Sequence, residues 1–286
     1  MRVSDTCAEC LFDKQRHLKK DPAYLEEVRQ ILESRREEDT SPYLVYLFQK
    51  ARERRFGKES PYGDIKREYN ALVLSMEEGL RKKIQASPDP LAAALVLARI
   101  GNYIDFGAMT HVDRDTFLSL FDDLSLSPHD EETLKSFRRE CRLAGNFLLI
   151  CDNCGEIILD RLFLEELKKE FPHLSLTVMV RGEEILNDAT KEDALYAGMD
   201  KVAEIVTNGG PVAGTVRSML PEEARKALDR ADVILSKGQG NYESLSGQGK
   251  HVFYSFLCKC SLFTARFSVP PLTGMFVEET QSGRII

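Results

Sequence analysis

The arrangement of apolar residues divides the chain into two parts. In the first part they recur every three or four positions, the period of a helix with one buried face. In the second part, short runs of consecutive apolar residues alternate with helical periods. Such runs are typical of strands buried on both faces of a sheet. The pattern predicts a helical domain over residues 1–143 and an α/β domain over residues 144–286.

Recognisable start and stop signals support the helices of the first part. Ser41 and Pro42 begin one periodic run, because serine caps a helix and proline fits its first turn. A second run follows Ser60 and Pro61 and stops at residues 87–90. The segment 91–100 is apolar on every side, so we expect it to form a helix buried in the middle of the protein.

Five apolar runs in the second part predict strands, over residues 147–150, 176–180, 202–206, 233–235 and 252–256. The intervening helices are predicted to begin near Glu156, Lys191, Pro221 and Lys259. Strands that alternate with helices indicate a mostly parallel sheet covered on both faces. The predicted fold class is therefore α/β.

Polar residues follow the carboxyl ends of these predicted strands, in the order Asp152, Asn153, Asp188, Asn208 and Lys237. Ligands of open α/β sheets bind at this edge, and parallel strands would bring all five residues to it. Oxygen-bearing side chains suit a divalent cation, while a lysine before a glycine-rich stretch suits a phosphate. The alternative is that these residues only shape turns and cap helices.

Two further polar residues, Asn102 and Asp105, follow the buried segment 91–100. Polar groups at the end of a buried helix are costly without partners. Asn102 and Asp105 either hydrogen-bond to neighbouring backbone or face the site at Asp152. The sequence leaves both possibilities open.

Composition and charge narrow the range of partners. The chain has 46 acidic and 39 basic residues and a net charge of −7, which disfavours a nucleic acid partner. No apolar run is long enough to span a membrane, and the N-terminus lacks an apolar signal core. We therefore expect a cytoplasmic protein whose seven cysteines are thiols or metal ligands, without a structural disulfide.

Familiar phosphate-binding motifs are missing. The sequence has no Walker loop and no Gly-x-Gly-x-x-Gly after the first predicted strand, which disfavours that type of nucleotide hydrolysis and a dinucleotide cofactor. Asp152 is followed by Asn153 and Cys154 rather than by a second aspartate two positions on. An aspartyl-phosphate mechanism of the haloacid-dehalogenase type is therefore not supported.

Four ordered motifs resemble those of the damage-control phosphatases, a family of metal-dependent phosphatases. They are Gly101-Asn102-x-x-Asp105, Asp152-Asn153-x-Gly155-Glu156, Asp188-Ala189-Thr190 and Lys237-Gly238-x-x-Asn241-Tyr242-Glu243. Cys7-x-x-Cys10 resembles the prokaryotic branch. The resemblance covers almost the whole chain. It implies a helical N-terminal region packed on a Rossmann-like α/β/α sandwich.

The resemblance also implies a chemistry. A divalent metal, Mn²⁺, Co²⁺, Ni²⁺ or Mg²⁺, would be held by Asp152, Asn153 and Asp188. A metal-activated water would hydrolyse small phosphomonoesters, such as sugar phosphates or damaged phosphorylated metabolites. The catalytic residues would be Asp152, Asp188 and Asp105, with either Asp188 or Asp105 orienting or deprotonating the water. The residues expected to bind substrate and phosphate are Lys237, Asn102, Glu156, Asn208 and Asn241.

Two other functions remain as alternatives. A non-catalytic protein could hold a phosphorylated ligand through the same strand-end loops. Eukaryotic relatives have also been assigned as carboxyl methyltransferases, but the chain has no glycine-rich methyl-donor loop after its first predicted strand. Phosphate release, methyl-donor binding and simple ligand retention would separate the three.

The cysteines allow two interpretations. Cys7 and Cys10 together with Cys258 and Cys260 could supply four thiolates to zinc, although the spacing of the second pair is unusual for zinc. Otherwise they are buried thiols without a redox role. Cys154 departs from the family pattern and is expected to place a thiol beside the metal.

Overall fold

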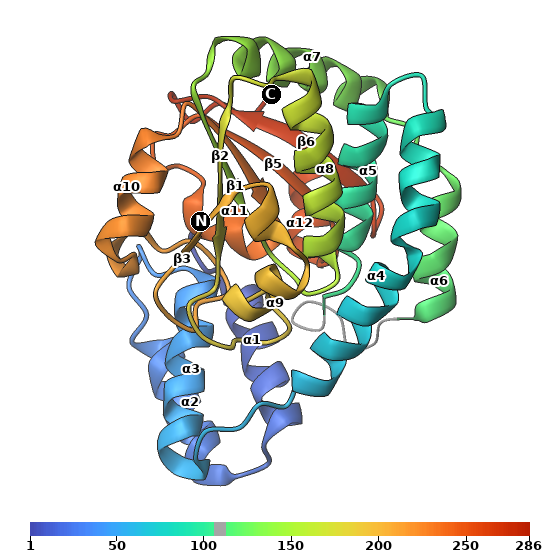
Figure 1. Ribbon diagram of the computed structural model, residues 1–286. Coiled ribbons are helices and arrows are strands. Elements are labelled where there is room, and N and C mark those ends of the chain that lie inside the picture. The colour runs from blue at the N-terminus through green and yellow to red at the C-terminus, as the bar shows by residue number, and fades with distance from the viewer. Residues whose placement is uncertain (106–112) are drawn as a thin grey trace.

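The computed structural model describes residues 1–105 and 113–286. Its six strands form one sheet in the order β3-β2-β1-β4-β5-β6 (Figure 1). The strands are β1 (Asn146–Ile150), β2 (Ser175–Val180), β3 (Glu204–Thr207), β4 (Val233–Lys237), β5 (Val252–Leu257) and β6 (Gly274–Glu279). The first five are parallel and β6 is antiparallel to β5. The predicted mostly parallel α/β sheet is thereby confirmed.

Helices cover both faces of this sheet. The helices of the N-terminal half are α1 (Asp5–Leu18), α2 (Pro22–Glu33), α3 (Ser41–Phe56), α4 (Gly63–Ala86), α5 (Pro90–Gly101), α6 (Arg114–Ser119) and α7 (Pro128–Leu143), of which α4, α5 and α7 share the core of the sheet. In the C-terminal half they are α8 (Glu156–Glu170), α9 (Lys191–Tyr196), α10 (Glu222–Arg230), α11 (Gln239–Leu245) and α12 (Ser261–Phe267).

The alternation of side chains along each strand separates the hydrophobic core into two layers. Leu149 of β1 faces the layer formed with α4, α5, α7 and α8. Its neighbour Leu148 faces the layer formed with α10, α11 and α12. The segment 91–100 is buried as predicted, since nearly all of α5 is inaccessible to solvent. α5 packs directly on α8, and a Cβ atom at Gly101 would lie only 2.8 Å from the Cα atom of Glu156.

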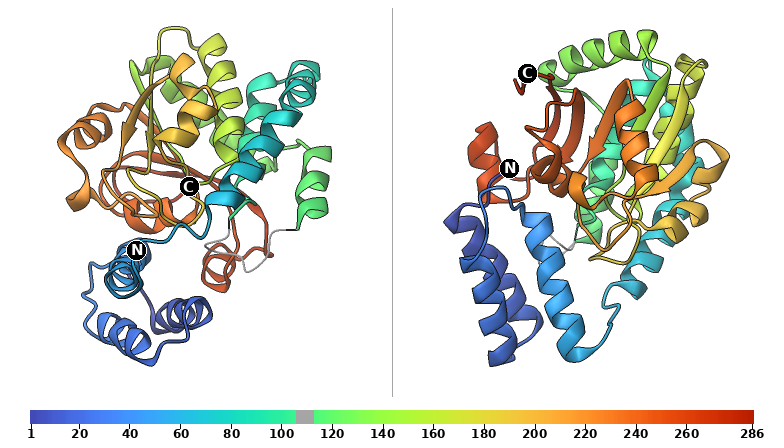
Figure 2. Two further views of the ribbon diagram at one scale, coloured as in Figure 1. Left: turned by 60° about the horizontal axis from the view of Figure 1, so that its bottom comes forward. Right: turned by 90° about the vertical axis from the view of Figure 1, so that its left-hand side faces the viewer.

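The helices α1, α2 and α3 form a unit with a hydrophobic core of its own, built around Tyr24, Val28 and Phe48. In Figures 1 and 2 this N-terminal unit, in blue, lies beyond one end of the sheet, at the edge where β1 and β2 end. α3 contacts α11, which joins the unit to the sheet domain. By contrast, α4, α5 and α7 share the core of the sheet. The predicted domain division after residue 143 stays a prediction.

Two elements differ from expectation. The sequence analysis did not identify β6, whose short apolar centre at residues 275–277 pairs antiparallel to β5 at one edge of the sheet. The glycine-rich stretch after Lys237, which the sequence analysis counts among the strand-end loops, is helix α11. Gly238 has a φ of +79° and makes the turn from β4, after which the chain is helical. The glycine content of this stretch suggests a loop, but Gly238 forms only the turn between β4 and α11.

None of the helices in the described part of the chain combines the length and the apolar character required to cross a membrane.

Asp89 anchors the start of α5 in two ways. Its carboxylate caps the helix by accepting a hydrogen bond from the Ala92 amide at 3.0 Å. It also pairs with both terminal nitrogens of Arg138 on α7, each at 2.7 Å. The hydrogen bonds from Arg138 lower the pKa of Asp89 below its usual value of 3.8. The carboxylate therefore stabilises the fold above about pH 4, and this contribution is lost as the pH falls through its lowered pKa.

Replacing Asp89 with asparagine keeps a good helix cap but removes the charge. We expect Asp89→Asn to lower the free energy of unfolding by about 1 kcal/mol at pH 7, a modest value because the pair is partly exposed. The difference from wild type should shrink below pH 4. Urea denaturation at several pH values measures it. Glu132→Gln, in an exposed pair with Lys135, is the control. An equal difference at pH 7 and pH 3 would contradict the assignment.

Candidate metal and phosphate site at the sheet edge

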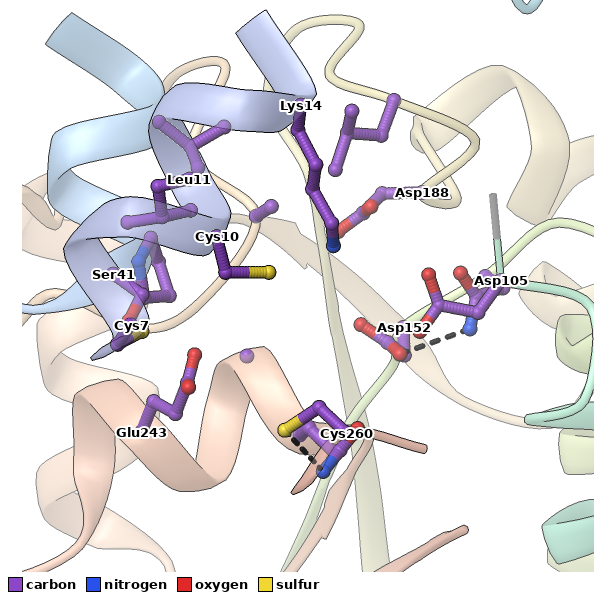
Figure 3. A pocket seen from close by; sticks show the side chains of 17 residues that line it. Cys7, Cys10, Leu11, Lys14, Ser41, Asp105, Asp152, Asp188, Glu243 and Cys260 are labelled. Atoms are coloured by element: carbon purple, nitrogen blue, oxygen red, sulfur yellow. Dashed lines mark hydrogen bonds between the residues drawn. The ribbon is translucent and has the colours of Figure 1, made fainter. Parts of the chain in front are cut away.

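A cavity of about 140 Å³ lies between the carboxyl ends of the strands and the N-terminal unit. Asp105, Asp152, Asn153 and Asp188 line it from the sheet side. Residues of α1 and α11 line it from the other side (Figure 3). The fold therefore brings together four residues that come from three separate parts of the sequence and that were predicted to act together.

Asp152 and Asn153 follow β1 and form the floor of the cavity. Oδ2 of Asp152 accepts hydrogen bonds from the side-chain amides of Asn102, at 3.0 Å, and Asn153, at 2.9 Å. Asn153 also forms an isolated β-bridge with Asp188. The alternative that these residues cap α8 is not supported, because the residue at the cap position is Gly155.

Asp188 reaches the same floor from the loop after β2. It does not cap α9, because that helix is capped by Thr190 in a reciprocal arrangement with Asp193. The carboxylate of Asp188 instead accepts a hydrogen bond from Nε of Arg181 at 2.6 Å. A second nitrogen of Arg181, Nη2, lies 3.2 Å from Oδ1 of Asp152. One guanidinium group thus holds both carboxylates.

Arg181 is completely buried just beyond the end of β2. Besides the two carboxylates, it donates to the side chain of Asn241 at 3.1 Å and to the backbone carbonyl of Gly214 at 3.3 Å. Arg181 does not line the cavity, so its charge acts from behind the floor. Each part of the guanidinium group therefore has a protein partner, as a buried charge requires.

Negative charge is in excess at this floor. Burial raises the pKa of Asp152 well above its usual value, and the neighbouring charges of Asp188 and Glu156 raise it further. Burial also raises the pKa of Asp188 to about 6, against the opposing effect of Arg181. A divalent cation would relieve this repulsion, and two carboxylates with one amide oxygen are hard donors of the kind that Mg²⁺ and Mn²⁺ accept. The donor set fits such a cation.

Asp105 lies at the cavity wall, where its carboxylate pairs with Nζ of Lys259 at 2.7 Å. Asn102, in contrast, is wholly buried behind the floor. It donates to Asp152 and to Glu156, and its side-chain oxygen accepts from the amide of Leu257 at 3.1 Å. Both possibilities foreseen for Asn102, a backbone partner and the Asp152 site, are therefore realised together.

Lys237 and Glu156 lie in a second buried network and do not line the cavity. The ammonium group of Lys237 donates to Glu156 at 2.6 Å, to Asp160 at 2.7 Å and to the carbonyl of Ala98 at 3.0 Å. Burial acts to lower the pKa of Lys237, but Asp160 and Glu156 outweigh it and the pKa is raised. The other oxygen of Glu156 accepts from the backbone amide of Asn153 at 3.1 Å. Their role in binding phosphate stays a prediction.

Asn208 and Asn241 are also buried behind the cavity. The side chain of Asn208 accepts a hydrogen bond from the amide of Gly182 at 2.8 Å and donates one to the carbonyl of Val212 at 2.9 Å. Asn241 donates to the carbonyls of Cys151 and Lys237, and so connects α11 to the ends of β1 and β4. In the structure both side chains organise loops, and their binding of substrate likewise stays a prediction.

Comparison with known proteins identifies the family. The family model for the damage-control phosphatase ARMT1-like domain matches residues 2–271. The chain belongs to this family. A damage-control phosphatase of Archaeoglobus fulgidus is 35% identical over 210 residues, which are 71% of this chain and 70% of that protein. Another, of Pyrococcus horikoshii, is 28% identical over 218 residues, 75% of this chain and 73% of that protein.

The fold has a solved counterpart. A crystal structure of a DUF89 family protein from Pyrococcus horikoshii matches with a TM-score of 0.78 and 24% identity, covering 96% of this chain and 98% of that chain. The resemblance inferred from the four motifs is thereby confirmed. Membership of this family supports a phosphatase role. The assignment of Cys7-x-x-Cys10 to a prokaryotic branch stays a prediction.

The cysteines do not form the four-thiolate zinc site considered from the sequence. Within residues 1–105 and 113–286, no three His, Cys, Asp or Glu side chains are gathered as a metal site. Cys7, Cys10 and Cys260 line the cavity, whereas Cys258 is buried in the core. Cys154, expected beside the metal, is also buried in the core and does not line the cavity.

Sequence reasoning missed Arg181 and the contribution of α1. A basic residue at the end of an apolar strand was the available signal for Arg181, since a charge in that position must find buried partners. On α1, residues Cys7, Cys10, Leu11 and Lys14 all line the cavity. Their spacing of three, four and seven places them on one face of a helix. That pattern was visible in the sequence, but its position over the sheet was not.

Removing Arg181 would leave two carboxylates buried without their shared partner. We expect Arg181→Leu to lower the free energy of unfolding by about 3–5 kcal/mol, the usual cost of breaking a buried charge set. Arg217→Leu, which removes an exposed pair with Asp229, should cost less than about 1 kcal/mol. Urea denaturation of the two variants measures both effects. Similar losses in both variants would show that Arg181 has no special structural role.

Proposed function

We propose that this protein is a metal-dependent phosphatase that hydrolyses small phosphomonoesters, such as sugar phosphates or damaged phosphorylated metabolites. The observation that carries the proposal is the pair of buried carboxylates, Asp152 and Asp188, on the floor of one cavity. Burial is the main cause of their elevated pKa values, and the neighbouring charges of Asp188 and Glu156 add to it at Asp152. Such a floor suits a cation and, through it, an anionic substrate.

Asp152, Asn153 and Asp188 would hold the divalent cation, Mn²⁺, Co²⁺, Ni²⁺ or Mg²⁺. When bound, the cation would supply Lewis-acid stabilisation of charge on the phosphoryl oxygens. Arg181 would keep the two carboxylates in place, and Glu156 would hold the loop that carries Asn153. These residues provide the preorganised geometry on which phosphoryl transfer depends.

Asp105 is the residue that we assign to the attacking water. Its carboxylate lines the cavity, and Lys259 holds it from one side. Asp188, the other candidate, would bind the cation and is also held by Arg181. In the proposed reaction Asp105 orients a water molecule and accepts its proton. The water oxygen forms a bond to phosphorus as the ester bond breaks, and the alkoxide that leaves takes up a proton from solvent water to give the alcohol.

The cavity also limits the substrate. Its volume of about 140 Å³ and its enclosure by the N-terminal unit favour a small metabolite over a phosphorylated macromolecule. Leu11, Val45 and Leu186 give part of the wall an apolar surface against which the carbon skeleton of a substrate can pack.

The first test is phosphate release from a panel of phosphomonoesters by metal-stripped protein, with each divalent metal added back. We expect at least one metal to restore activity. Tight binding of phosphorylated ligands without phosphate release under any metal would favour the non-catalytic binding protein. Binding of a methyl donor would favour the methyltransferase.

The second test is Asp188→Asn, which preserves the size of the side chain and removes its charge. We expect the fold to be retained, metal content to fall and phosphatase activity to be almost completely lost. Elemental analysis, activity at saturating metal and circular dichroism measure these three properties. Asp200→Asn, on an exposed position, is the matched control. A variant of Asp188 with full metal content and full turnover would remove this residue from the site.

A further inference from the structure

The charges that face the cavity are unevenly distributed. Four carboxylates line it, those of Asp105, Asp152, Asp188 and Glu243. Among the described residues that line it, Lys14 alone carries a positive charge. The substrate of the proposed reaction brings further negative charge, because a phosphate monoester carries about −1.5 to −2 at neutral pH. The cavity therefore needs cationic groups at its surface to balance the charge of its carboxylates and of the substrate.

Three other cations lie near the floor, behind the surface of the cavity. Arg181 holds Asp152 and Asp188, and it lies behind the floor. Lys237 is wholly buried between α5, α8 and β4. Lys259 pairs with Asp105, and its side chain is inaccessible to solvent. None of these three residues lines the cavity. Lys14 is therefore the cationic side chain, among the described residues of the lining, that a phosphate entering the cavity would contact.

Lys14 comes from the N-terminal unit rather than from the sheet. It lies on the same face of α1 as Cys7, Cys10 and Leu11, all of which line the cavity. Figure 3 shows its side chain extending from α1 into the cavity, toward the wall formed by the sheet-edge carboxylates. A long, flexible lysine on this face can follow an incoming phosphoryl group while the helix stays in place.

We propose that Lys14 binds the phosphoryl oxygens of the substrate and thereby makes the N-terminal unit part of the active site. This inference rests on the proposed phosphatase function and adds a substrate-binding residue to it. The metal ligands of the sheet edge and Lys14 would then hold the phosphoryl group from opposite sides. The N-terminal unit contributes a charge that the sheet edge does not present to the cavity.

A competing explanation for Lys14 is that it only offsets the charge of Glu243. Burial raises the pKa of Glu243 to about 7, and the charges of the N-terminal amino group and of Lys14 oppose that rise. If this were its whole task, Lys14 would matter only while Glu243 is present. The double variant Lys14→Gln/Glu243→Gln distinguishes the two roles.

The experiment compares Lys14→Gln and Lys14→Arg with wild type, in the full chain loaded with the metal that best restores wild-type activity. Steady-state kinetics give kcat and KM for several phosphomonoesters. Calorimetry gives the Kd of inorganic phosphate, and elemental analysis gives metal content. Lys20→Gln is the matched control, because it removes the same charge from an exposed position just beyond α1.

We expect Lys14→Gln to lower kcat/KM by about 10- to 150-fold for every phosphomonoester, the factor for a hydrogen bond to a charged group. The Kd of inorganic phosphate should rise by a similar factor, with metal content and circular dichroism unchanged. Lys14→Arg should retain most of the affinity, and Lys20→Gln should match wild type. The double variant with Glu243→Gln should remain as impaired as Lys14→Gln.

Three results would overturn the proposal. One is an unchanged Kd of inorganic phosphate in Lys14→Gln, and another is a loss confined to some substrates, which would indicate contact with a different substrate group. The third is recovery in the double variant, which would assign Lys14 to Glu243. If wild type binds phosphate but releases none from any ester, the proposed function fails, while the phosphate Kd of the variants still decides the role of Lys14. If wild type neither binds phosphate nor releases it from any ester, both fail. If it releases phosphate but does not bind it, the inference about Lys14 fails alone.

Discussion

The sheet edge depends on one buried guanidinium group. Arg181 is removed from water completely, and a charge in that position is stable only when its nitrogens find good partners. It finds them in Asp152 after β1, in Asp188 after β2 and in Asn241 on α11. These three segments meet at Arg181, so the need to pair this charge fixes how they sit relative to one another. The floor of the cavity follows from that constraint.

Lys237 is a second buried charge whose need for partners connects elements of the core. Lys237 connects β4 to α8 through Glu156 and Asp160, and to α5 through the carbonyl of Ala98. Glu156 carries the connection onward, because its other oxygen accepts from the backbone and side chain of Asn153. Ion pairs and hydrogen bonds to charged groups therefore reach from α5 to the cavity floor. The nitrogen atoms of Arg181 and Lys237 all have partners, which helps this dry interior to hold its geometry.

Much of this arrangement can be predicted from the sequence, because it follows from local patterns. Apolar runs mark β1 to β5, and the rule for open α/β sheets then places Asp152, Asn153 and Asp188 at one edge. The observed cavity contains all three, together with Asp105. The buried character of α5 was equally evident, since its residues are apolar on every side. These features need no knowledge of which segments pack together.

The sequence could not show features that depend on packing between distant segments. A lysine before a glycine-rich stretch suits a phosphate, yet Lys237 turns inward because two carboxylates of α8 lie within its reach. Gly238 suggests a loop, but glycine is required here for lack of space. A Cβ atom at this position would lie 2.0 Å from Oδ2 of Asp152. The role of Arg181 likewise appears only once β1 and β2 are paired.

The N-terminal unit and the sheet edge are stabilised by different interactions, and both parts line the cavity. The floor is fixed by buried ion pairs, and none of the pairs made by Arg181 or Lys237 includes a residue of α1. The unit of α1 to α3 is stabilised by its own apolar core. Substitutions of Cys7, Cys10 or Leu11 on the cavity face of α1 therefore change the wall that a substrate meets and leave the ion pairs of Arg181 and Lys237 in place. The groups suited to holding a cation thus lie at the sheet edge, whereas α1 shapes the space in which a substrate would bind.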